Sequence, residues 1–370
     1  MTKLLVTQGK IASGAEKVTS ILYEDMKDDL IVLSGTKPQL EYFSNCGFVV
    51  EKVDGLQALN RDSFKFNKLI KVMKSFIPLR KSLLKHWPEY IHVYNLPSLL
   101  YTSISLMGKA KNFPIVLHVH DYYSKDKLLK LFSVFLRRKP YKIIAVSNSV
   151  KRDLISLKFP ETKICVVHNG IVDKQQYQNK NYIVNSESTN ELNVIFIGSI
   201  AKWKGLHILL KAAEILKYQS NIQVNFNIAG PFLDKEYEKE IRILSEKVPY
   251  QVSFLGKVEN PEELMNKMDI LVHCSIEKDP FPTVVLEGLA AGIAVIASSA
   301  GGAKEVIKEM DTGLLHAPGN YKELAKKLQT LIDNPGLRSQ ISRNGYSYAL
   351  EFLNKDRYKK NFFGAITNLT

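Results

Sequence analysis

Residues 269–292 read DILVHCSIEKDPFPTVVLEGLAAG, and this stretch predicts a strand, a loop and a helix in succession. DILVHC is a short apolar run typical of a buried strand. PTVVLEGLAA has the length of a helix, and Pro282 suits its first turn because the missing N–H of proline loses no bond there. Strand-to-helix units of this kind build parallel sheets covered by helices. The stretch therefore predicts an α/β fold.

Similar apolar runs recur along the whole chain in two series. The first half contains KLLVTQ, DLIVLSG, YIHVYN, FPIVLHVH, YKIIAVS and KICVVHNG, and the second half contains LNVIFIG, VNFNIAG, VSFLG, DILVHC and AVIASS. Helix-length segments separate these runs. We therefore predict two doubly wound, Rossmann-like domains that face a cleft and bind ligands at the carboxyl ends of their strands.

The length of 370 residues also favours two domains. The polar stretch VDKQQYQNKNYIVNSESTNE lacks periodicity and indicates a linker. We place an N-terminal domain at residues 1–178, the linker at 179–192 and a C-terminal domain at 193–345. Residues 346–370 are expected to form a helix that packs back on the N-terminal domain.

The positive charge of the chain is concentrated in its first half. Residues 1–175 contain 28 Lys+Arg and 15 Asp+Glu, whereas residues 176–370 contain 23 and 22. This asymmetry points to an anionic partner of the first domain, either a membrane surface or a nucleic acid. The chain has no apolar run of membrane-spanning length and no signal-peptide pattern, and its three cysteines form no CxxC pair. These features predict a protein of the cytoplasm, a reducing compartment.

Two acids flank the start of the helix in the quoted stretch. Glu287 stands among apolar neighbours, where an unpaired carboxylate would cost several kcal/mol, and Asp279 precedes the helix. The helix start, with Phe281, Pro282 and Thr283, presents unpaired amides that suit a phosphate. The order acid, phosphate site, acid matches the sugar, diphosphate and ribose of a nucleotide sugar. A solvated glutamate and an ordinary loop aspartate are the alternatives.

A second loop, in IFIGSIAKWKGLHILLKAA, lies between a strand that ends at Gly198 and an amphipathic helix. It contains Ser199, Lys202 and Lys204. Lysines at such a loop suit a diphosphate leaving group, whose charge grows as the glycosidic bond breaks. Because the chain holds 51 Lys+Arg, ordinary loop lysines are the alternative.

Two features of the first half are candidates for the acceptor side. Gly14, in SGAEKV, would allow a ligand to approach the backbone closely, or would form a simple glycine turn. VLHVHDYY places His118 and His120 on one face of a strand, with His120 at the ligand-binding end. A structural histidine is the alternative to a functional one, and the lack of a third ligand argues against a metal.

Two cationic segments, FKFNKLIKVMKSFI (64–77) and KDKLLKLFSVFLRRK (125–139), combine lysines with large apolar residues. In the first, Phe66, Leu69, Ile70, Met73, Phe76 and Ile77 are predicted to share one helical face, and Pro78 interrupts the helix. Such helices suit an anionic membrane interface, at about 1 kcal/mol per basic residue. Solvated lysines over a packed apolar face are the alternative. Nucleic-acid binding is disfavoured because no recognised module accompanies the charge.

Taken together, these motifs resemble the retaining glycosyltransferases of family four, which have the GT-B fold. GSIAKWKG, AGP, VSFLG, DPFPTVVLEGLAAG, AVIASSAGGAKEVI and TGLLHAPGN occur in the order of that family's donor domain, and SGAEKV, YIHVYN, VLHVHD, AVSNSVK and VVHNGI resemble its first domain. The resemblance implies that residues 1–178 bind the acceptor and residues 193–345 the nucleotide-sugar donor. It covers nearly the whole chain.

The resemblance also implies roles for single residues. Glu287 would bind the donor ribose, Asp279 would contact sugar hydroxyls, Lys204 would hold the diphosphate with help from Lys202, and His120 would lie beside the sugar or acceptor hydroxyl. Two positions depart from the family pattern. Asp279 replaces the usual Glu, and Ser199 stands where an Arg commonly follows the strand glycine Gly198.

The resulting hypothesis is a metal-independent glycosyltransferase at the inner face of the cell membrane. It would transfer a sugar with retention from a nucleoside diphosphate, with UDP expected, to a hydroxyl of a glycan or lipid-linked acceptor in polysaccharide synthesis. A nucleotide-sugar hydrolase or epimerase of the same fold and a non-catalytic membrane or nucleic-acid adaptor are the alternatives. No cofactor is expected besides the nucleotide-sugar co-substrate.

Overall fold

The computed structural model describes residues 2–9, 14–58, 66–108, 113–174, 191–217 and 222–367. These residues form two compact units. Unit 1 comprises Met1–Asn169 and Asp356–Thr370, and unit 2 comprises Gly170–Lys355. Residues 179–190 of the predicted linker lie outside the described residues.

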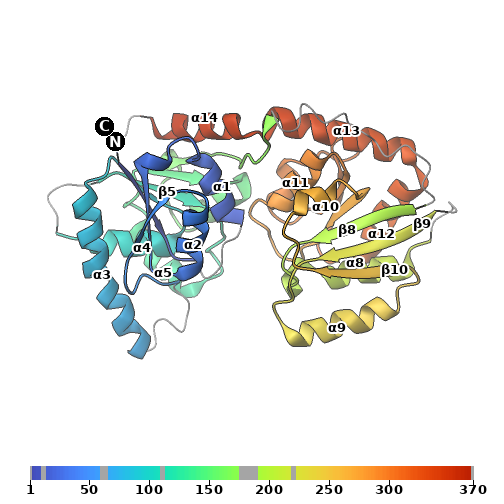
Figure 1. Cartoon of the computed structure of the whole chain (residues 1–370), viewed down its shortest axis with the longest axis horizontal. Coiled ribbons are helices and arrows are strands. Elements are labelled where there is room, and N and C mark those ends of the chain that lie inside the picture. The colour runs from blue at the N-terminus through green and yellow to red at the C-terminus, as the bar shows by residue number, and fades with distance from the viewer. Residues whose placement is uncertain are drawn as a thin grey trace. The chain divides into compact units, whose positions relative to one another are not determined.

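Each unit is built on one parallel sheet (Figure 1). In unit 1 the strand order is β3 (Val49–Lys52), β2 (Leu30–Ser34), β1 (Lys3–Thr7), β4 (Ile91–Val93), β5 (Ile115–Val119), β6 (Lys142–Ala145) and β7 (Ile164–Val166). In unit 2 it is β10 (Gln251–Gly256), β9 (Gln223–Ala229), β8 (Glu191–Ile197), β11 (Ile270–His273), β12 (Ala294–Ser298) and β13 (Leu314–His316). The predicted doubly wound α/β architecture is thereby confirmed.

Burial on both faces explains why most strands are continuous apolar runs. All residues of β5 and β12 are buried. Two strands were not predicted. The edge strand β3 has two exposed ends and a polar second half, VVEK, and β13 has three residues, so neither carries a clear apolar run.

Helices connect the strands in both units. Unit 1 contains α1 (Gly14–Leu22), α2 (Lys37–Asn45), α3 (Phe66–His86), α4 (Leu96–Ser105), α5 (Lys127–Leu136), α6 (Asn148–Ser156) and most of α14 (Lys355–Ile366). Unit 2 contains α8 (Leu206–Ile215), α9 (Lys235–Glu246), α10 (Pro261–Met265), α11 (Thr283–Ala291), α12 (Tyr321–Asp333) and α13 (Pro335–Phe352). The described residues also form the short 3-10 helices η1 (Lys27–Asp29), η3 (Glu161–Lys163), η4 (Lys202–Lys204) and η5 (Ala303–Glu305).

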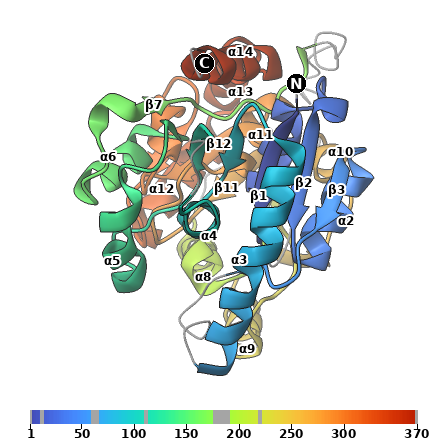
Figure 2. The same cartoon turned by 90° about the vertical axis from the view of Figure 1, so that its left-hand side faces the viewer.

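The helix α3 differs from its prediction in one way. It continues through Pro78, which removes one backbone hydrogen bond without ending the helix. Met73 and Ile77, predicted to share one face of this helix, are 60% and 66% exposed, whereas Val72 and Leu79 are buried. The side chains of residues 64–71 lie outside the described part of the chain. α4 packs on both α3 and α5, and Figure 2 shows it between them.

The terminal helical segment predicted near residue 346 forms two helices that belong to different units. α13 packs on α11 and β12 in unit 2, whereas residues from Asp356 onward belong to unit 1. There, Tyr358 and Phe362 of α14 are buried. None of the helices within the described ranges is long and apolar enough to cross a membrane.

Candidate functional site

The strand order of unit 2 reverses between β8 and β11. In an open parallel sheet, loops that leave the carboxyl ends of strands at such a point diverge and leave room for a ligand. The loop after β8 leads into η4, and the loop after β11 carries residues 274–282. Both loops identified from the sequence therefore leave neighbouring strands at the switch point.

Gly205 allows η4 to lie close to the end of β11. Its φ is 75°, and a Cβ atom at this position would lie 2.0 Å from the carbonyl oxygen of Cys274. The backbone N–H of Ile276 donates to the Trp203 carbonyl at 2.8 Å, and the Cys274 thiol donates to the Gly205 carbonyl at 3.2 Å. These contacts fasten the lysine-bearing turn to the acid-bearing loop.

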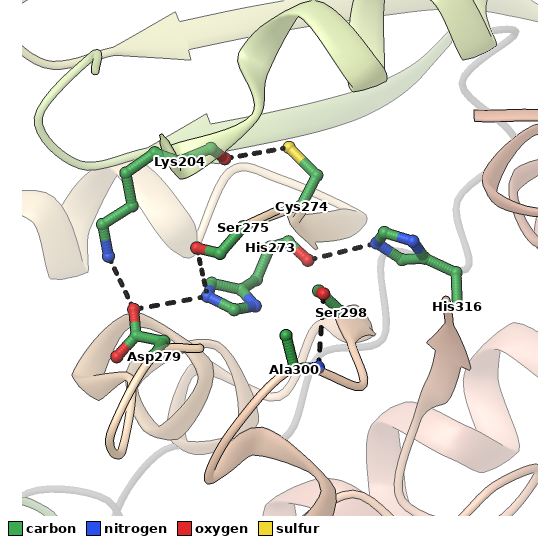
Figure 3. A network of polar contacts seen from close by, with 8 residues as sticks. All are labelled: Lys204, His273, Cys274, Ser275, Asp279, Ser298, Ala300 and His316. Atoms are coloured by element: carbon green, nitrogen blue, oxygen red, sulfur yellow. Dashed lines mark hydrogen bonds and ion pairs between the residues drawn. The ribbon is translucent and has the colours of Figure 1, made fainter. Parts of the chain in front are cut away.

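The Lys204 ammonium lies 2.7 Å from Oδ2 of Asp279 (Figure 3). It also lies 4.2 Å from the centre of the Trp203 ring. The Asp279 side chain is 9% exposed. Burial alone would raise the pKa of Asp279, but the hydrogen bond from His273 and the charge of Lys204 hold that pKa below its usual range. Asp279 is therefore a buried, ionised carboxylate that is paired with a lysine.

The backbone of Asp279 is held by the loop after β12. The Asp279 N–H donates to the Ala300 carbonyl at 3.4 Å, and its carbonyl accepts from the Gly302 N–H at 2.8 Å. Gly301 has a φ of 92°, and a Cβ there would lie 2.0 Å from the Asp279 carbonyl oxygen. A side chain at residue 301 would therefore displace the acid.

His273 joins this cluster, and the sequence analysis did not select it. Its Nε2 lies 3.0 Å from Oγ of Ser275 and 3.5 Å from Oδ2 of Asp279. Its carbonyl oxygen lies 3.4 Å from Nε2 of His316, and burial lowers the pKa of His316. Figure 3 shows Lys204 and His273 approaching the same carboxylate. The available signal was a histidine at the end of a strand that leads into the candidate loop.

The helix α11 begins at Thr283, one residue later than predicted, with Pro282 as its N-cap. Phe281 and Pro282 are buried. Glu287 is half-buried, as is Thr283 one turn earlier, whereas Leu286 and Gly288 beside it are buried. Glu287 therefore lies on the helix side that leaves the core, which it shares with the first turn. Its side chain is therefore less enclosed than its apolar neighbours in the sequence suggest.

Three further predicted residues lie at the end of β8 and in the loop that follows it. Gly198 and Ser199 are half-buried at the end of β8, and the Gly198 N–H donates to the Ala229 carbonyl. The Lys202 side chain is 70% exposed, and its ammonium lies 3.8 Å from Oε2 of Glu240 on α9. Lys202 thus faces another acid, although it is two residues from Lys204.

The remaining two predicted residues belong to unit 1. Gly14 is the first residue of α1. His120 follows β5, and its ring centre lies 4.1 Å from that of His118, which in turn lies 5.5 Å from that of His92 on β4. Burial lowers the pKa of His120 and of His92 to about 3, and that of His118 as well. These imidazoles are neutral at ordinary pH, and His92 was not singled out from the sequence.

Within the described residues, no cluster of three or more His, Cys, Asp or Glu side chains is arranged to hold a metal ion. The site therefore consists of one ion pair, a histidine next to it and a helix N-terminus in unit 2. This set can bind an anion through Lys204 and the α11 amides and can accept hydroxyl protons through carboxylate oxygens.

The chain matches known proteins over most of its length. Residues 26–175 match the family model described as Glycosyltransferase Family 4, and residues 178–348 match that described as Glycosyl transferases group 1. Spore coat protein SA of Bacillus subtilis is 27% identical over 79% of this chain and 79% of its own length. A Campylobacter jejuni enzyme, named as an alpha-1,4-N-acetyl-D-galactosaminyltransferase acting on a PP-undecaprenol-linked glycan, is 27% identical over 81% of this chain and 80% of its own.

A solved structure from Anabaena, HepE in complex with UDP and glucose, has a TM-score of 0.83 with this chain. It is 21% identical in sequence, and 99% of each chain is covered. This similarity establishes the fold, which is GT-B, with two Rossmann-like domains.

Proposed function

The chain belongs to the family-four glycosyltransferases, and from this premise we propose that it transfers a sugar, with retention, from a UDP-sugar to a hydroxyl of a glycan or lipid-linked acceptor in cell-surface polysaccharide synthesis. The arrangement at the β8–β11 switch point carries the proposal. Lys204 lies in the loop after β8, and Asp279 and the N-terminus of α11 follow β11. All three therefore lie at adjacent strand ends of one sheet.

The donor would bind along three successive groups of unit 2. Lys204 and the first amides of α11 bind the diphosphate, Asp279 accepts hydrogen bonds from sugar hydroxyls, and Glu287 binds the ribose diol. At about 1.5 Å per residue, Glu287 lies about 7 Å along the helix from Pro282, which suits the step from diphosphate to ribose. The UDP and glucose of the Anabaena structure support this donor class.

The acceptor proposal is supported by the relatives. The Campylobacter enzyme is named for a glycan on undecaprenyl diphosphate, so a lipid-linked glycan is the acceptor class that we propose here. His120 would lie beside the acceptor hydroxyl or the transferred sugar. Its neutral imidazole, with a pKa near 3, would serve as a hydrogen-bond partner rather than as a cation.

The reaction is proposed to proceed on one face of the sugar. A donor phosphate oxygen takes the proton of the acceptor hydroxyl as the glycosidic bond breaks, and Lys204 with the α11 amides stabilises the departing diphosphate. Cations of the chain, rather than a metal ion, balance the charge in this proposal. Turnover that is insensitive to EDTA would agree with it.

Glu287→Ala tests the donor assignment, with turnover measured over a panel of nucleotide sugars. We expect kcat/KM to fall about 10-fold to 100-fold, because two ribose hydroxyls lose a charged acceptor. Glu246→Ala, on α9, is the control and should leave turnover unchanged. Unchanged donor affinity and turnover in Glu287→Ala would contradict the assignment. Free sugar released at the full rate without an acceptor would instead favour a hydrolase.

We also propose that the protein works at the inner, cytoplasmic face of the cell membrane through the α3–α5 face, defined as the exposed side chains Met73, Ile77, Leu131, Val134 and Phe135. Neither α3 nor α5 contains an acidic residue. Lys127 and Lys130 on α5 are exposed, as are Arg138 and Lys139 just after it, and the Lys139 ammonium lies 4.7 Å from the centre of the Phe135 ring. Apolar side chains among cations suit an anionic lipid surface.

Co-sedimentation with vesicles that contain anionic lipid tests this face. Binding should fall steeply with salt, and Leu131→Ser with Val134→Ser should weaken it about 10-fold. Ile243→Ser, on α9 of unit 2, is the matched control because Ile243 is also an exposed apolar side chain. Binding that does not depend on salt, or an equal effect of the control, would refute the proposal.

A further inference from the structure

His273 is a buried histidine next to the donor groups, and the proposed reaction gives it no role. It is 4% exposed and ends β11, the strand that leads to Asp279. Its Nε2 lies near both the Ser275 hydroxyl and the Asp279 carboxylate, as Figure 3 shows. The role proposed for this imidazole rests on the proposed donor site.

The ion pair that His273 borders carries no net charge. Both contacts of the Asp279 carboxylate, with Lys204 and with His273, fall on Oδ2. A diphosphate brings at least two negative charges and attracts the Lys204 ammonium. Asp279 would then be a buried carboxylate that shares or loses its cation, which is costly unless another positive charge replaces it.

The other groups that contact His273 are neutral, negative or engaged by the diphosphate. The ring itself is therefore the remaining source of the positive charge that Asp279 needs. From β13, His316 contacts the His273 carbonyl, and its lowered pKa keeps it neutral. From β12, Ala297 pairs with His273 and brings no titratable group, and from its own loop His273 faces Ser275 and Asp279. Lys204, from the β8 loop, would be engaged by the diphosphate.

Nδ1 of His273 is buried and has no hydrogen-bond partner among the described residues, so a second ring N–H would gain no acceptor there. The Ser275 hydroxyl can donate to Nε2 or accept from it, so Nε2 has a partner in either neutral tautomer. An imidazolium can only donate, and its Nε2–H would face Asp279.

A bound diphosphate changes this balance. A negative charge near an imidazole favours its protonated form, and the interaction is stronger at the low effective dielectric constant of a buried site. A second charge adds to the effect, and withdrawal of the Lys204 ammonium acts in the same direction.

We propose that His273 is a positioning residue of the donor site that takes up a proton when a nucleoside diphosphate binds. The resulting imidazolium replaces Lys204 as the counter-charge of Asp279. Lys204 is thereby released to the diphosphate while the Asp279 carboxylate stays ionised and correctly placed for the sugar.

The test is calorimetry of UDP binding at pH 7.5 in MOPS and in Tris, whose ionisation enthalpies differ. The dependence of the heat on the buffer gives the number of protons exchanged. His273→Gln is the key variant, because its amide keeps a donor toward Asp279 but cannot be protonated. Subtracting its result from that of the native protein cancels any proton released by UDP itself. His316→Gln is the matched control, and His273→Asn replaces His273→Gln if that variant does not unfold cooperatively.

We expect the native protein and His316→Gln to take up between about half a proton and one proton more per UDP than His273→Gln, which should bind UDP about 10-fold more weakly. A merely structural histidine would weaken binding without changing the proton count. Equal proton counts in the native protein and His273→Gln would overturn the inference alone. No binding of UDP by the native protein would overturn the proposed donor site and this inference with it.

Discussion

In unit 2 a buried carboxylate lies 2.7 Å from a lysine ammonium, whereas in unit 1 the buried His92 and His118 and the half-buried His120 lie ring against ring. Asp279 stays ionised because Lys204 and His273 compensate it. His92, His118 and His120 stay neutral because burial disfavours their charged forms. Within the same doubly wound architecture, unit 2 thus holds an ionised carboxylate with compensating partners, whereas unit 1 holds histidines that stay uncharged.

Removal of the compensating cation should give the largest effect. In Lys204→Ala we expect kcat/KM to fall about 1000-fold, because the departing diphosphate loses its cation, and the free energy of unfolding to fall by about 3 kcal/mol, because Asp279 is left buried with only His273 nearby. Steady-state kinetics and urea unfolding measure the two effects. Adding Asp279→Asn should recover stability but not turnover. Loss of stability that persists in the double variant would show that the charge is not its cause.

The backbone that holds the compensated acid should be nearly as sensitive. Gly301→Ala places a Cβ against the Asp279 carbonyl at a φ that L-residues rarely adopt, so we expect the free energy of unfolding to fall by about 3 kcal/mol. Gly336→Ala is the control, because no atom lies within 4 Å of its Cβ position. Thermal unfolding compares the two variants, and similar losses would argue against a clamp at residue 301.

The neutral histidines of unit 1 should make the free energy of unfolding depend on pH. The folded-state pKa values of these histidines lie below the unfolded value of about 6.5, so the unfolded chain binds more protons as pH falls from about 6.5 toward about 3. Stability is therefore complete above pH 6.5 and is lost below it, at about 1.4 kcal/mol per pH unit for each histidine.

His118→Phe removes one of the three titrating rings at similar volume. Between pH 8 and pH 5 the variant should lose about 2 kcal/mol less stability than the native chain. Urea unfolding across that range is the measurement. Parallel pH profiles of the two proteins would mean that His118 does not resist protonation in the fold.

The smallest effect is expected within the β8 loop, two residues from Lys204. Lys202 is exposed and faces Glu240 at 3.8 Å, so Lys202→Ala should change stability by less than about 0.5 kcal/mol and kcat/KM by less than about threefold. Kinetics with a saturating acceptor measure this. A tenfold loss would indicate that Lys202 turns toward the diphosphate, as the sequence analysis predicts.

The sequence predicts the sheets well because buried parallel strands are apolar throughout, as in β5 and β12. It does not predict β3, whose ends are exposed at a sheet edge. The extent of α3 is also missed, since the rest of the helix tolerates the hydrogen bond lost at Pro78. Local pattern thus captures elements that are buried on both faces, and it fails where tertiary packing overrides a single residue.

The candidate site is predicted in part for a related reason. Asp279, Lys204 and Glu287 stand at strand and helix ends that the pattern marks. The direct pairing of Lys204 with Asp279 depends on two loops 75 residues apart in sequence, and no local pattern encodes it. His273 was passed over because one histidine at a strand end is chemically ambiguous until its neighbours in space are known.

The clamp on Asp279 gives a meaning to its departure from the family pattern. The N–H and the carbonyl of this residue both form hydrogen bonds with the loop after β12, and these bonds fix the position of its Cα. Side-chain length then becomes the one adjustable dimension, and Asp in place of Glu withdraws the carboxylate by about one C–C bond, about 1.5 Å. Compared with glutamate, aspartate at this position therefore leaves a gap of about 1.5 Å, which a bulkier sugar substituent or an ordered water can fill.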